Sequence, residues 1–349
     1  MGLIVEDELR SLLDAIGSMS DTTSGTEGLG ATAVPDQRDG SVYVLNDDVV
    51  LALKVAVITG RPLLLTGDPG SGKSSLAAYV ARNLNWRYYE HVVSARTEAT
   101  DLLWTFDAVR KLADASRPRT GGTQLHDEDY VEPGVLWWAL NPDSARTRGA
   151  DHPPARPPTE PNAALNAPPR SAQHAVVLID EIDKADPDAP NGLLVPLGSM
   201  QFEVAETQRT IRLAGTEDGK AGPQRGRILI VITTNKERDL PSAFVRRCVV
   251  HGLPSPGVPM LVTIAEAHAA AGEQELSPSQ RELCTEVASR LVELQEKAGN
   301  SDRWSPGTAE YLDAVRACIR LNITVDSTQW SLIEQLTLVK DEAYSSPAP

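Results

Sequence analysis

The feature that most constrains this 349-residue chain is the octapeptide Gly67-Asp68-Pro69-Gly70-Ser71-Gly72-Lys73-Ser74, which fits the pattern GxxxxGK[ST]. It follows an apolar strand predicted at 63–65 and precedes a helix predicted at 74–84, the context in which this pattern forms a phosphate-binding loop. Glycines let main-chain N–H groups turn toward phosphate oxygens, and the helix start adds partial positive charge. We predict that Lys73 reaches the β- and γ-phosphates of ATP and that Ser74 ligates Mg²⁺. Ser75 completes the residues expected to contact the nucleotide, and a chance glycine-rich turn is the alternative.

Short apolar strands alternate with helices over residues 41–257. The strands are predicted at 63–65, 88–93, 175–179, 228–233 and 249–251, and a further helix runs from Asp47 or Asp48 to Thr59. This alternation favours an α/β domain with a parallel sheet and helices on both faces. The pattern then changes to helices alone, predicted at 261–271, 278–297, 308–321 and 328–344. Residues 258–345 are therefore predicted to form a smaller, all-helical domain.

Three segments fall outside this pattern. Apolar residues at helical spacing predict an amphipathic helix over 1–16, and the Gly-, Ser- and Thr-rich stretch 17–40 predicts a flexible linker. Residues 141–170 hold eight prolines and almost no large apolar side chain, which predicts a disordered loop. A linker between domains is the alternative, but strands resume beyond it, which favours an insertion within one domain.

Bulk composition narrows the class of protein. The formal net charge of −15 makes non-specific nucleic-acid binding an unfavourable interpretation, because neutralising phosphates requires clustered Lys and Arg. No apolar run reaches the ~20 residues of a membrane span, and the N-terminus carries acids where a signal peptide carries basic residues. A cytoplasmic location is expected. The three cysteines are scattered, so neither a zinc site nor a disulfide framework is predicted, and we expect them to be small buried side chains.

A second chemical feature is the apolar run 175–179 that ends in Asp180 and Glu181. Carboxylates at the C-terminal edge of a parallel strand face the crevice where ligands bind. Asp180 is the expected Mg²⁺ ligand, and Glu181 is placed to orient or deprotonate the water that attacks the γ-phosphate. The alternative for Glu181 is a solvated loop acid. Asp183 and Lys184 are expected to cap and solvate the next helix.

Two further features follow along the chain. The strand 228–233 leads to Asn235, which can hydrogen-bond both the attacking water and a phosphate oxygen, a role that Thr233 or Thr234 could share; the alternative is that Asn235 opens a turn. Arg246 and Arg247 precede the last strand, and either guanidinium could stabilise transition-state charge at a neighbour's γ-phosphate. Two exposed basic residues are the alternative there.

These four features, in this order, resemble the AAA+ superfamily and specifically the MoxR-like ATPases. The stretches that carry the resemblance are RPLLLTGDPGSGKSS, PGVLWWAL, VVLIDEIDKADPDAPNGLL, IVITTN and LPSAFVRRC. The resemblance covers roughly residues 42–253, with helices in the place of a lid. It implies a P-loop NTPase sandwich with five strands in the order 5-1-4-3-2, a helical lid and a hexameric ring. It also implies ATP bound between subunits and remodelling of a partner protein, possible partners including von Willebrand factor A-type proteins.

The resemblance also implies roles for individual residues. Lys73 and Ser74 match Walker A, Asp180 and Glu181 match Walker B, and Asn235 matches sensor 1. Arg246 or Arg247 becomes the arginine finger. Trp137 and Trp138 lie in a segment that faces the ring surface and contacts substrate or a neighbour, with burial in the core as the alternative, and residues 202–212 match a pore-lining hairpin. The chain departs from the family in two places. The interval between the Walker A and Walker B motifs is long. Gly307 stands where a sensor 2 arginine often stands, and Arg303 or Arg316 could substitute for that arginine.

The function predicted from the sequence is an ATP-hydrolysing, chaperone-like remodeller that works as a ring. The alternative is a nucleotide-switched signalling or defence regulator with little turnover. A nucleic-acid motor is disfavoured, because the candidate pore hairpin sets Arg209 and Arg212 against Glu203 and Glu206.

Overall fold

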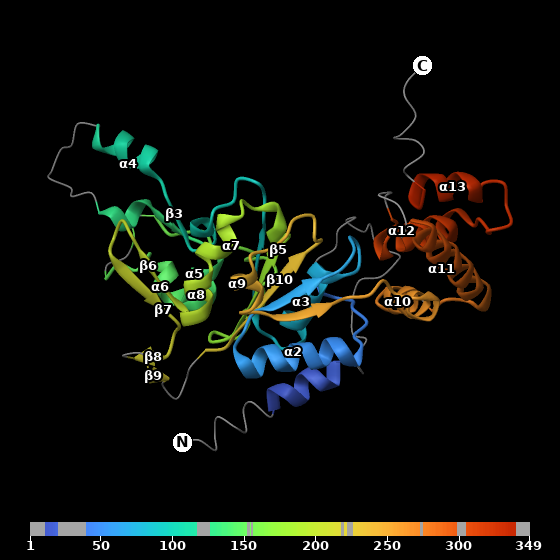
Figure 1. Ribbon diagram of the computed structural model, residues 1–349, viewed down its shortest axis with the longest axis horizontal. Coiled ribbons are helices and arrows are strands. Elements are labelled where there is room, and N and C mark those ends of the chain that lie inside the picture. Colours follow the sequence, from blue (N-terminus) through green and yellow to red (C-terminus); the bar gives the residue numbers. More distant parts are fainter. Residues whose placement is uncertain are drawn as a thin grey trace. The chain divides into compact units, whose positions relative to one another are not determined.

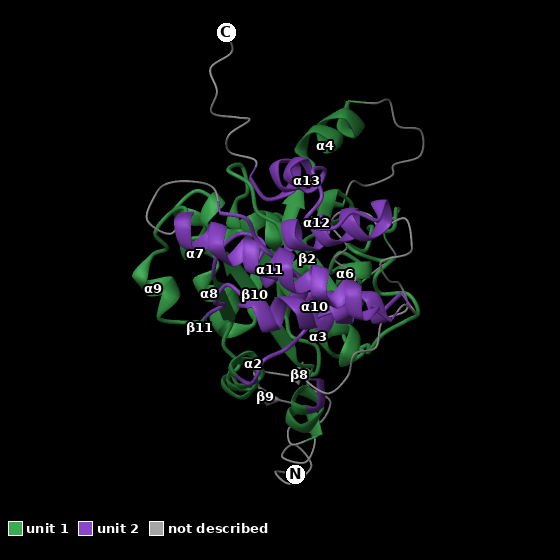
Figure 2. Cartoon of the chain, turned by 90° about the vertical axis from the view of Figure 1, so that its right-hand side faces the viewer, with its two compact units in different colours: residues 1–17, 48–66, 80–251 green, residues 18–47, 67–79, 252–349 purple. Residues whose placement is uncertain are grey.

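The computed structural model describes residues 11–19, 40–116, 126–151, 154, 156–217, 220–221, 226–272, 275–298 and 305–339. The chain divides into two compact units, which Figure 2 colours separately. Unit 1 takes residues 1–17, 48–66 and 80–251, and unit 2 takes 18–47, 67–79 and 252–349. The sequence predicted a single division near residue 257. The phosphate loop instead groups with the C-terminal helices, because its glycines pack closely on residues that lie beyond Gly252.

The core of unit 1 is a five-stranded parallel sheet (Figure 1). Its strands lie in the order β11-β1-β10-β5-β2, which is 5-1-4-3-2 when the five are numbered along the chain. Each strand begins and ends within one residue of its predicted bounds: β1 Leu63–Thr66, β2 Arg87–Val92, β5 Ala175–Asp180, β10 Ile228–Thr234 and β11 Val249–Gly252. All six residues of β5 are buried, as expected for a central strand covered on both faces. The predicted α/β fold is confirmed.

Short elements surround this sheet in unit 1. They are α2 Asp47–Thr59, η2 Ala99–Leu102, β3 Trp104–Phe106, α4 Ala108–Ala115, η3 Asp127–Tyr130, β4 Val131–Pro133, α5 Val135–Leu140, α6 Pro142–Arg146, η4 Ile182–Lys184, α7 Asp188–Gly192, α8 Leu194–Ser199, β6 Gln201–Val204, β7 Arg209–Arg212, β8 Thr216–Glu217, β9 Lys220–Ala221 and α9 Ser242–Val245. The predicted hairpin over 202–212 is present as the antiparallel pair β6–β7.

The two tryptophans of α5 belong to the core. Trp137 is fully buried and Trp138 is 1% exposed, and Trp137 packs edge-on against Phe202 of β6 with ring centroids 5.8 Å apart. The expectation that these tryptophans contact a substrate or a neighbouring subunit is wrong, because residues of unit 1 already cover their large apolar area.

The proline-rich stretch 141–170 differs from the expected disordered loop. Its first residues form α6, and further along the side chains of Asn162 and Asn166 bond the main chain of the edge strand β2. The Tyr88 N–H donates to Asn166 Oδ1 and the Glu90 N–H donates to Asn162 Oδ1, each at 2.8 Å. Asn166 Nδ2 also donates to the Tyr88 carbonyl at 3.1 Å. Polar side chains here take the place of a neighbouring strand, and they protect an edge that would otherwise be open to pairing.

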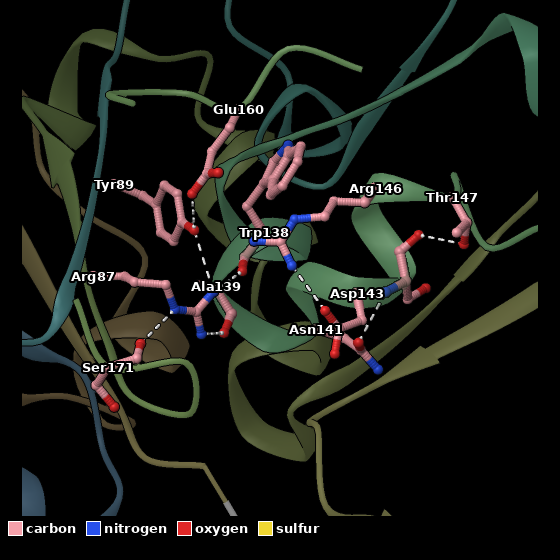
Figure 3. A network of polar contacts seen from close by, with 11 residues as sticks. Arg87, Tyr89, Trp138, Ala139, Asn141, Asp143, Arg146, Thr147, Glu160 and Ser171 are labelled. Carbon is pink, nitrogen blue, oxygen red and sulfur yellow. Dashed lines mark hydrogen bonds and ion pairs between the residues drawn. The ribbon is translucent and has the colours of Figure 1, made fainter. Parts of the chain in front are cut away.

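A buried arginine of β2 bonds α5 and Ser171, and it contacts the same stretch through Tyr89 and Glu160 (Figure 3). Arg87 is 5% exposed and donates to the carbonyls of Trp138 at 2.8 Å and Ser171 at 3.1 Å. It also donates to the Tyr89 hydroxyl, which in turn donates to Glu160 at 2.9 Å. A guanidinium satisfies several carbonyls at once because its donors lie in a fixed fork. Order in this stretch therefore comes from hydrogen bonds, which the apolar pattern does not reveal.

The described residues of unit 2 after Gly252 include four helices: α10 Val258–Ala270, α11 Pro278–Ala298, α12 Thr308–Leu321 and α13 Trp330–Thr337. Apolar side chains from all four form one core, which includes Leu261, Val287, Tyr311 and Trp330. The predicted all-helical region is confirmed, although α13 ends at Thr337, and residues 340–349 lie outside the described part. All three cysteines are free and buried, as expected.

The N-terminal segment is described in part. Residues 11–18 are helical, and Ile16 and Met19 are buried. The rest of the predicted helix over 1–16 and of the predicted linker over 17–40 lies almost wholly outside the described residues. Among the described helices, none combines the length and apolar character that a membrane span requires.

Candidate functional site

The phosphate loop leaves β1 after Thr66, whose Cα partner on β10 is Thr234. Three of its glycines have positive φ: Gly67 at 155°, Gly70 at 75° and Gly72 at 85°. A Cβ at Gly67 would lie 2.6 Å from the carbonyl oxygen of Leu253, so that position admits only glycine. The loop therefore has the backbone that the GxxxxGK[ST] pattern predicts.

Lys73 opens the helix α3 Lys73–Asn83 and is 6% exposed. Its Nζ donates to the carbonyl oxygens of Gly67 at 2.8 Å and Asp68 at 2.7 Å, and to Ser71 Oγ at 3.4 Å. The ammonium group is thus held inside the curve of the loop, where a phosphate would be cradled. Asp68 is also tied to Ser255, whose hydroxyl donates to its carboxylate at 2.8 Å.

The start of α12 meets the same loop within unit 2. A Cβ at Gly307 would lie 2.7 Å from the Pro69 carbonyl oxygen and 3.1 Å from Gly70 Cα. A larger side chain at this position would require the loop or the helix to shift, so the contact favours glycine where the resemblance expects a sensor 2 arginine. Of the two suggested substitutes, Arg303 lies outside the described residues. Arg316 lies on α12, 3.8 Å from Asp313.

The two acids lie at the end of β5. Asp180 is 1% exposed, and its neighbour on β10 is Thr233, because Ile179 and Ile232 are partners in the register. The Thr233 hydroxyl donates to Asp180 Oδ1 at 2.6 Å and accepts the Glu181 N–H at 2.8 Å. Glu181 has φ 60° and ψ 50°, a left-handed conformation that residues other than glycine seldom adopt.

Both carboxylate oxygens of Glu181 accept hydrogen bonds. Asn235 Nδ2 donates to Oε1 at 3.1 Å, which brings together the two residues that the sequence had placed at neighbouring strand ends. Lys184 Nζ donates to Oε2 at 2.7 Å. This hydrogen bond raises the pKa of Lys184, with the charge of Glu181 acting in the same direction.

Asp183 and Lys184 do not have the expected helix-capping role. Lys184 pairs with Glu181, and Asp183 is 3% exposed with its Oδ2 accepting the Glu237 N–H at 2.9 Å. Asp183 thereby ties the turn after β5 to the turn after β10. Neither contact was predicted from the sequence. The spacing of three residues between Glu181 and Lys184 is a signal that could have indicated the ion pair between them.

The arginine pair follows α9 and is exposed at both positions. Arg247 Nη1 donates to the Ala243 carbonyl at 3.1 Å, and Arg61 Nη1 donates to the main-chain carbonyl of Arg246 at 3.3 Å. Because both arginines are exposed, their exposure does not distinguish which of Arg246 and Arg247 would be the arginine finger.

The donor set fits Mg²⁺. This ion prefers oxygen ligands and is usually held by one or two carboxylates together with substrate phosphates. Asp180 supplies a buried carboxylate, and Ser74 supplies a hydroxyl in the first turn of α3. Each of these two groups is of a chemical type that would hold the ion, Asp180 in unit 1 and Ser74 in unit 2.

A comparison with known protein families gives a match over the sheet and the site. The model described as AAA domain (dynein-related subfamily) matches residues 62–248, more than half of the chain, and the match spans the phosphate loop, both acids, Asn235 and both arginines. The chain belongs to the AAA family. ATP binding and hydrolysis are the activities associated with that domain, and they agree with the loop and the acids of this AAA protein. A search of curated proteins finds no match.

Proposed function

We propose that this AAA protein binds ATP at residues 67–75 and hydrolyses it, with Glu181 orienting or deprotonating the attacking water. The observation that carries the proposal is the hydrogen bond from Asn235 Nδ2 to Glu181 Oε1, which is 3.1 Å long. Glu181 is the residue directly after the buried strand β5, which ends in Asp180. Ligands of open α/β sheets bind at this edge. Lys73 and the loop amides would hold the phosphates, and Mg²⁺ bound by Ser74 and Asp180 would supply charge neutralisation there.

The proposal includes assembly into a ring, hexameric as in the MoxR-like ATPases that the sequence resembles. The exposure of Arg246 and Arg247 supports this part, because a finger must reach a neighbouring subunit's γ-phosphate. Such a ring would remodel a partner protein, with the hairpin β6–β7 lining its pore. A von Willebrand factor A-type partner is proposed on the resemblance alone.

A second candidate is a nucleotide-switched regulator with little turnover. The ion pair between Lys184 and Glu181 favours it, since an acid held by an ammonium group is restrained from acting on water. The two candidates differ in turnover. Steady ATP hydrolysis that a partner stimulates supports the remodeller, whereas tight binding with negligible turnover supports the switch.

The experiment that tests the proposal compares the wild-type protein with Glu181→Gln. We expect both to bind a fluorescent ATP analogue with Mg²⁺, and we expect the variant to lose about 100-fold or more in turnover, the range for a positioned general base. Its oligomer should also persist longer with ATP in light-scattering measurements. Glu293→Gln is the matched control, because that acid pairs with Arg290 on the surface of α11. Absence of ATP binding by the wild-type protein would overturn the proposal, and unchanged turnover of Glu181→Gln would overturn the role of Glu181.

The finger is tested by mixing subunits. We expect either Arg246→Ala or Arg247→Ala to lose turnover while still binding ATP. Mixing that variant with Glu181→Gln subunits should restore activity, because a site with an intact Glu181 then receives an intact arginine from its neighbour. A mixture that stays inactive would count against action between subunits.

A further inference from the structure

The hydroxyl of Thr233 joins the two acids of the proposed hydrolytic site. Thr233 is fully buried near the end of β10. Its single proton goes to Asp180 Oδ1 at 2.6 Å, and its oxygen accepts the Glu181 N–H at 2.8 Å. One hydroxyl can make both bonds, because it offers one donor and two lone pairs. The same atom thus contacts the side chain of one acid and the main chain of the next.

The second of these bonds falls where the backbone most needs support. Glu181 has φ 60°, and side-chain-bearing residues persist in this region only when their surroundings hold them there. The Glu181 carbonyl accepts the Lys184 N–H at 3.0 Å, which closes the following turn. Since Thr233 accepts a hydrogen bond from the Glu181 N–H, both main-chain polar groups of Glu181 are hydrogen-bonded. The direction of its side chain toward Asn235 depends on this conformation.

The neighbouring threonine has a different role. The Thr234 hydroxyl accepts the Lys236 N–H at 3.0 Å, so it supports the turn that contains Asn235. Successive side chains of a strand point to opposite faces of the sheet, so Thr233 and Thr234 cannot share the same partners. The sequence left Thr233 and Thr234 as equal candidates for sensing, and the hydrogen bonds distinguish them.

We infer that Thr233 is a positioning residue for ATP hydrolysis, which sets the orientation of the metal-binding carboxylate of Asp180 and the conformation of Glu181 through one hydroxyl. This inference rests on the proposed function. Partners of metal-ligating groups are typically worth 10- to 100-fold in metal affinity or activity. A threonine suits the position because its branched Cβ favours a strand and limits side-chain rotation.

The test compares Thr233→Val, which keeps the shape and removes the hydroxyl, with Thr233→Ser, which keeps the hydroxyl. We expect Thr233→Val to bind the ATP analogue without Mg²⁺ as the wild-type protein does, to lose most of the gain in affinity that Mg²⁺ provides, and to lose about 10- to 100-fold in kcat. Thr233→Ser should recover most of both losses. Thr97→Val is the matched control, since the buried Thr97 hydroxyl accepts the Ser94 N–H instead.

A third measurement needs neither turnover nor metal. In the wild-type protein the Glu181 amide should be protected from hydrogen exchange to the level of strand amides, and Thr233→Val should raise its exchange rate about tenfold while Thr97→Val leaves it unchanged. An unprotected Glu181 amide in the wild-type protein would overturn the inference even if Thr233→Val failed to fold. Equal behaviour of Thr233→Val and wild type, or a Thr233→Ser variant as defective as Thr233→Val, would also overturn it. If the wild-type protein failed to bind ATP, the proposed function would be refuted. The hydrogen-exchange measurement alone would then test whether Thr233 holds the Glu181 main chain.

Discussion

Lys184 Nζ lies 2.7 Å from Glu181 Oε2, so the acid proposed to act on water is paired with a cation from the next turn of its own chain. An ammonium group in this place competes with a water molecule for the carboxylate. Lys184 is charged at neutral pH, and because the hydrogen bond to Glu181 raises the pKa of Lys184, this charge is lost only above the ordinary lysine value of 10.5. The structure therefore indicates a restrained Glu181 throughout the physiological pH range.

Removing this cation should raise basal turnover. We expect Lys184→Met to hydrolyse ATP up to about fivefold faster than the wild-type protein without a partner, because partly exposed ion pairs are worth up to about 1 kcal/mol. Steady-state hydrolysis at pH 7.5 is the measurement. Lys111→Met is the control, since Lys111 makes a comparable exposed pair with Asp127 at 2.6 Å. A fall in turnover for Lys184→Met would show that Lys184 assists the reaction.

Much of the fold could be predicted because its signals are local. Each apolar run became a strand within one residue of its predicted bounds, and the order of the five strands follows the resemblance. The positive φ of Gly67, Gly70 and Gly72 is likewise what their pattern requires. Local patterns succeed here because backbone conformation and strand burial depend on neighbours in the sequence.

The contacts that could not be predicted connect distant residues. Thr233 bonds Asp180 across 53 positions of the chain, and Asn166 bonds Tyr88 across 78. Such pairs depend on register and on side-chain direction, which a single sequence does not reveal. The stretch 141–170 was predicted to be disordered because it has few apolar residues, yet its asparagines bind main-chain groups. Likewise, the pattern around Trp137 does not distinguish a core tryptophan from an exposed one.

The contact between α12 and the phosphate loop leads to a prediction on Gly307. Gly307→Ala would place a methyl group 2.7 Å from the Pro69 carbonyl oxygen, so the loop or the helix must move. We expect a loss of about 1–3 kcal/mol in stability, as for overpacked sites, and weaker binding of ATP. Gly198→Ala is the control, because nothing lies within 4 Å of its added Cβ. Thermal unfolding and ATP titration are the measurements, and equal results for both variants would contradict the contact.

The buried thiols predict a chemical property. Burial raises the pKa of Cys248 and of Cys318 from 9.0 to about 11, and it also raises the pKa of Cys284. At pH 8 only about one in a thousand of the Cys248 and Cys318 thiols is then ionised, and the thiolate is the reactive form. We expect the folded protein to react with a thiol reagent far more slowly than the denatured protein. Because the folded-state pKa values of Cys248 and Cys318 are raised, the contribution of these two thiols to stability is present below about pH 9 and is lost as pH rises toward 11. A cysteine that reacts at the rate of free cysteine would contradict this.

The asparagines that cover β2 allow a test at single amides. Asn166→Ala removes the acceptor of the Tyr88 N–H, and Asn162→Ala removes that of the Glu90 N–H, each bond being 2.8 Å long. A net hydrogen bond is worth about 1 kcal/mol, so each variant should raise hydrogen exchange about five- to tenfold at its own amide. Each variant is the control for the other. The double variant should also self-associate, because it leaves an edge strand uncovered. If exchange at Tyr88 and Glu90 did not change, this stretch would not be acting as the neighbour of β2, and the order found over residues 156–170 would need another source.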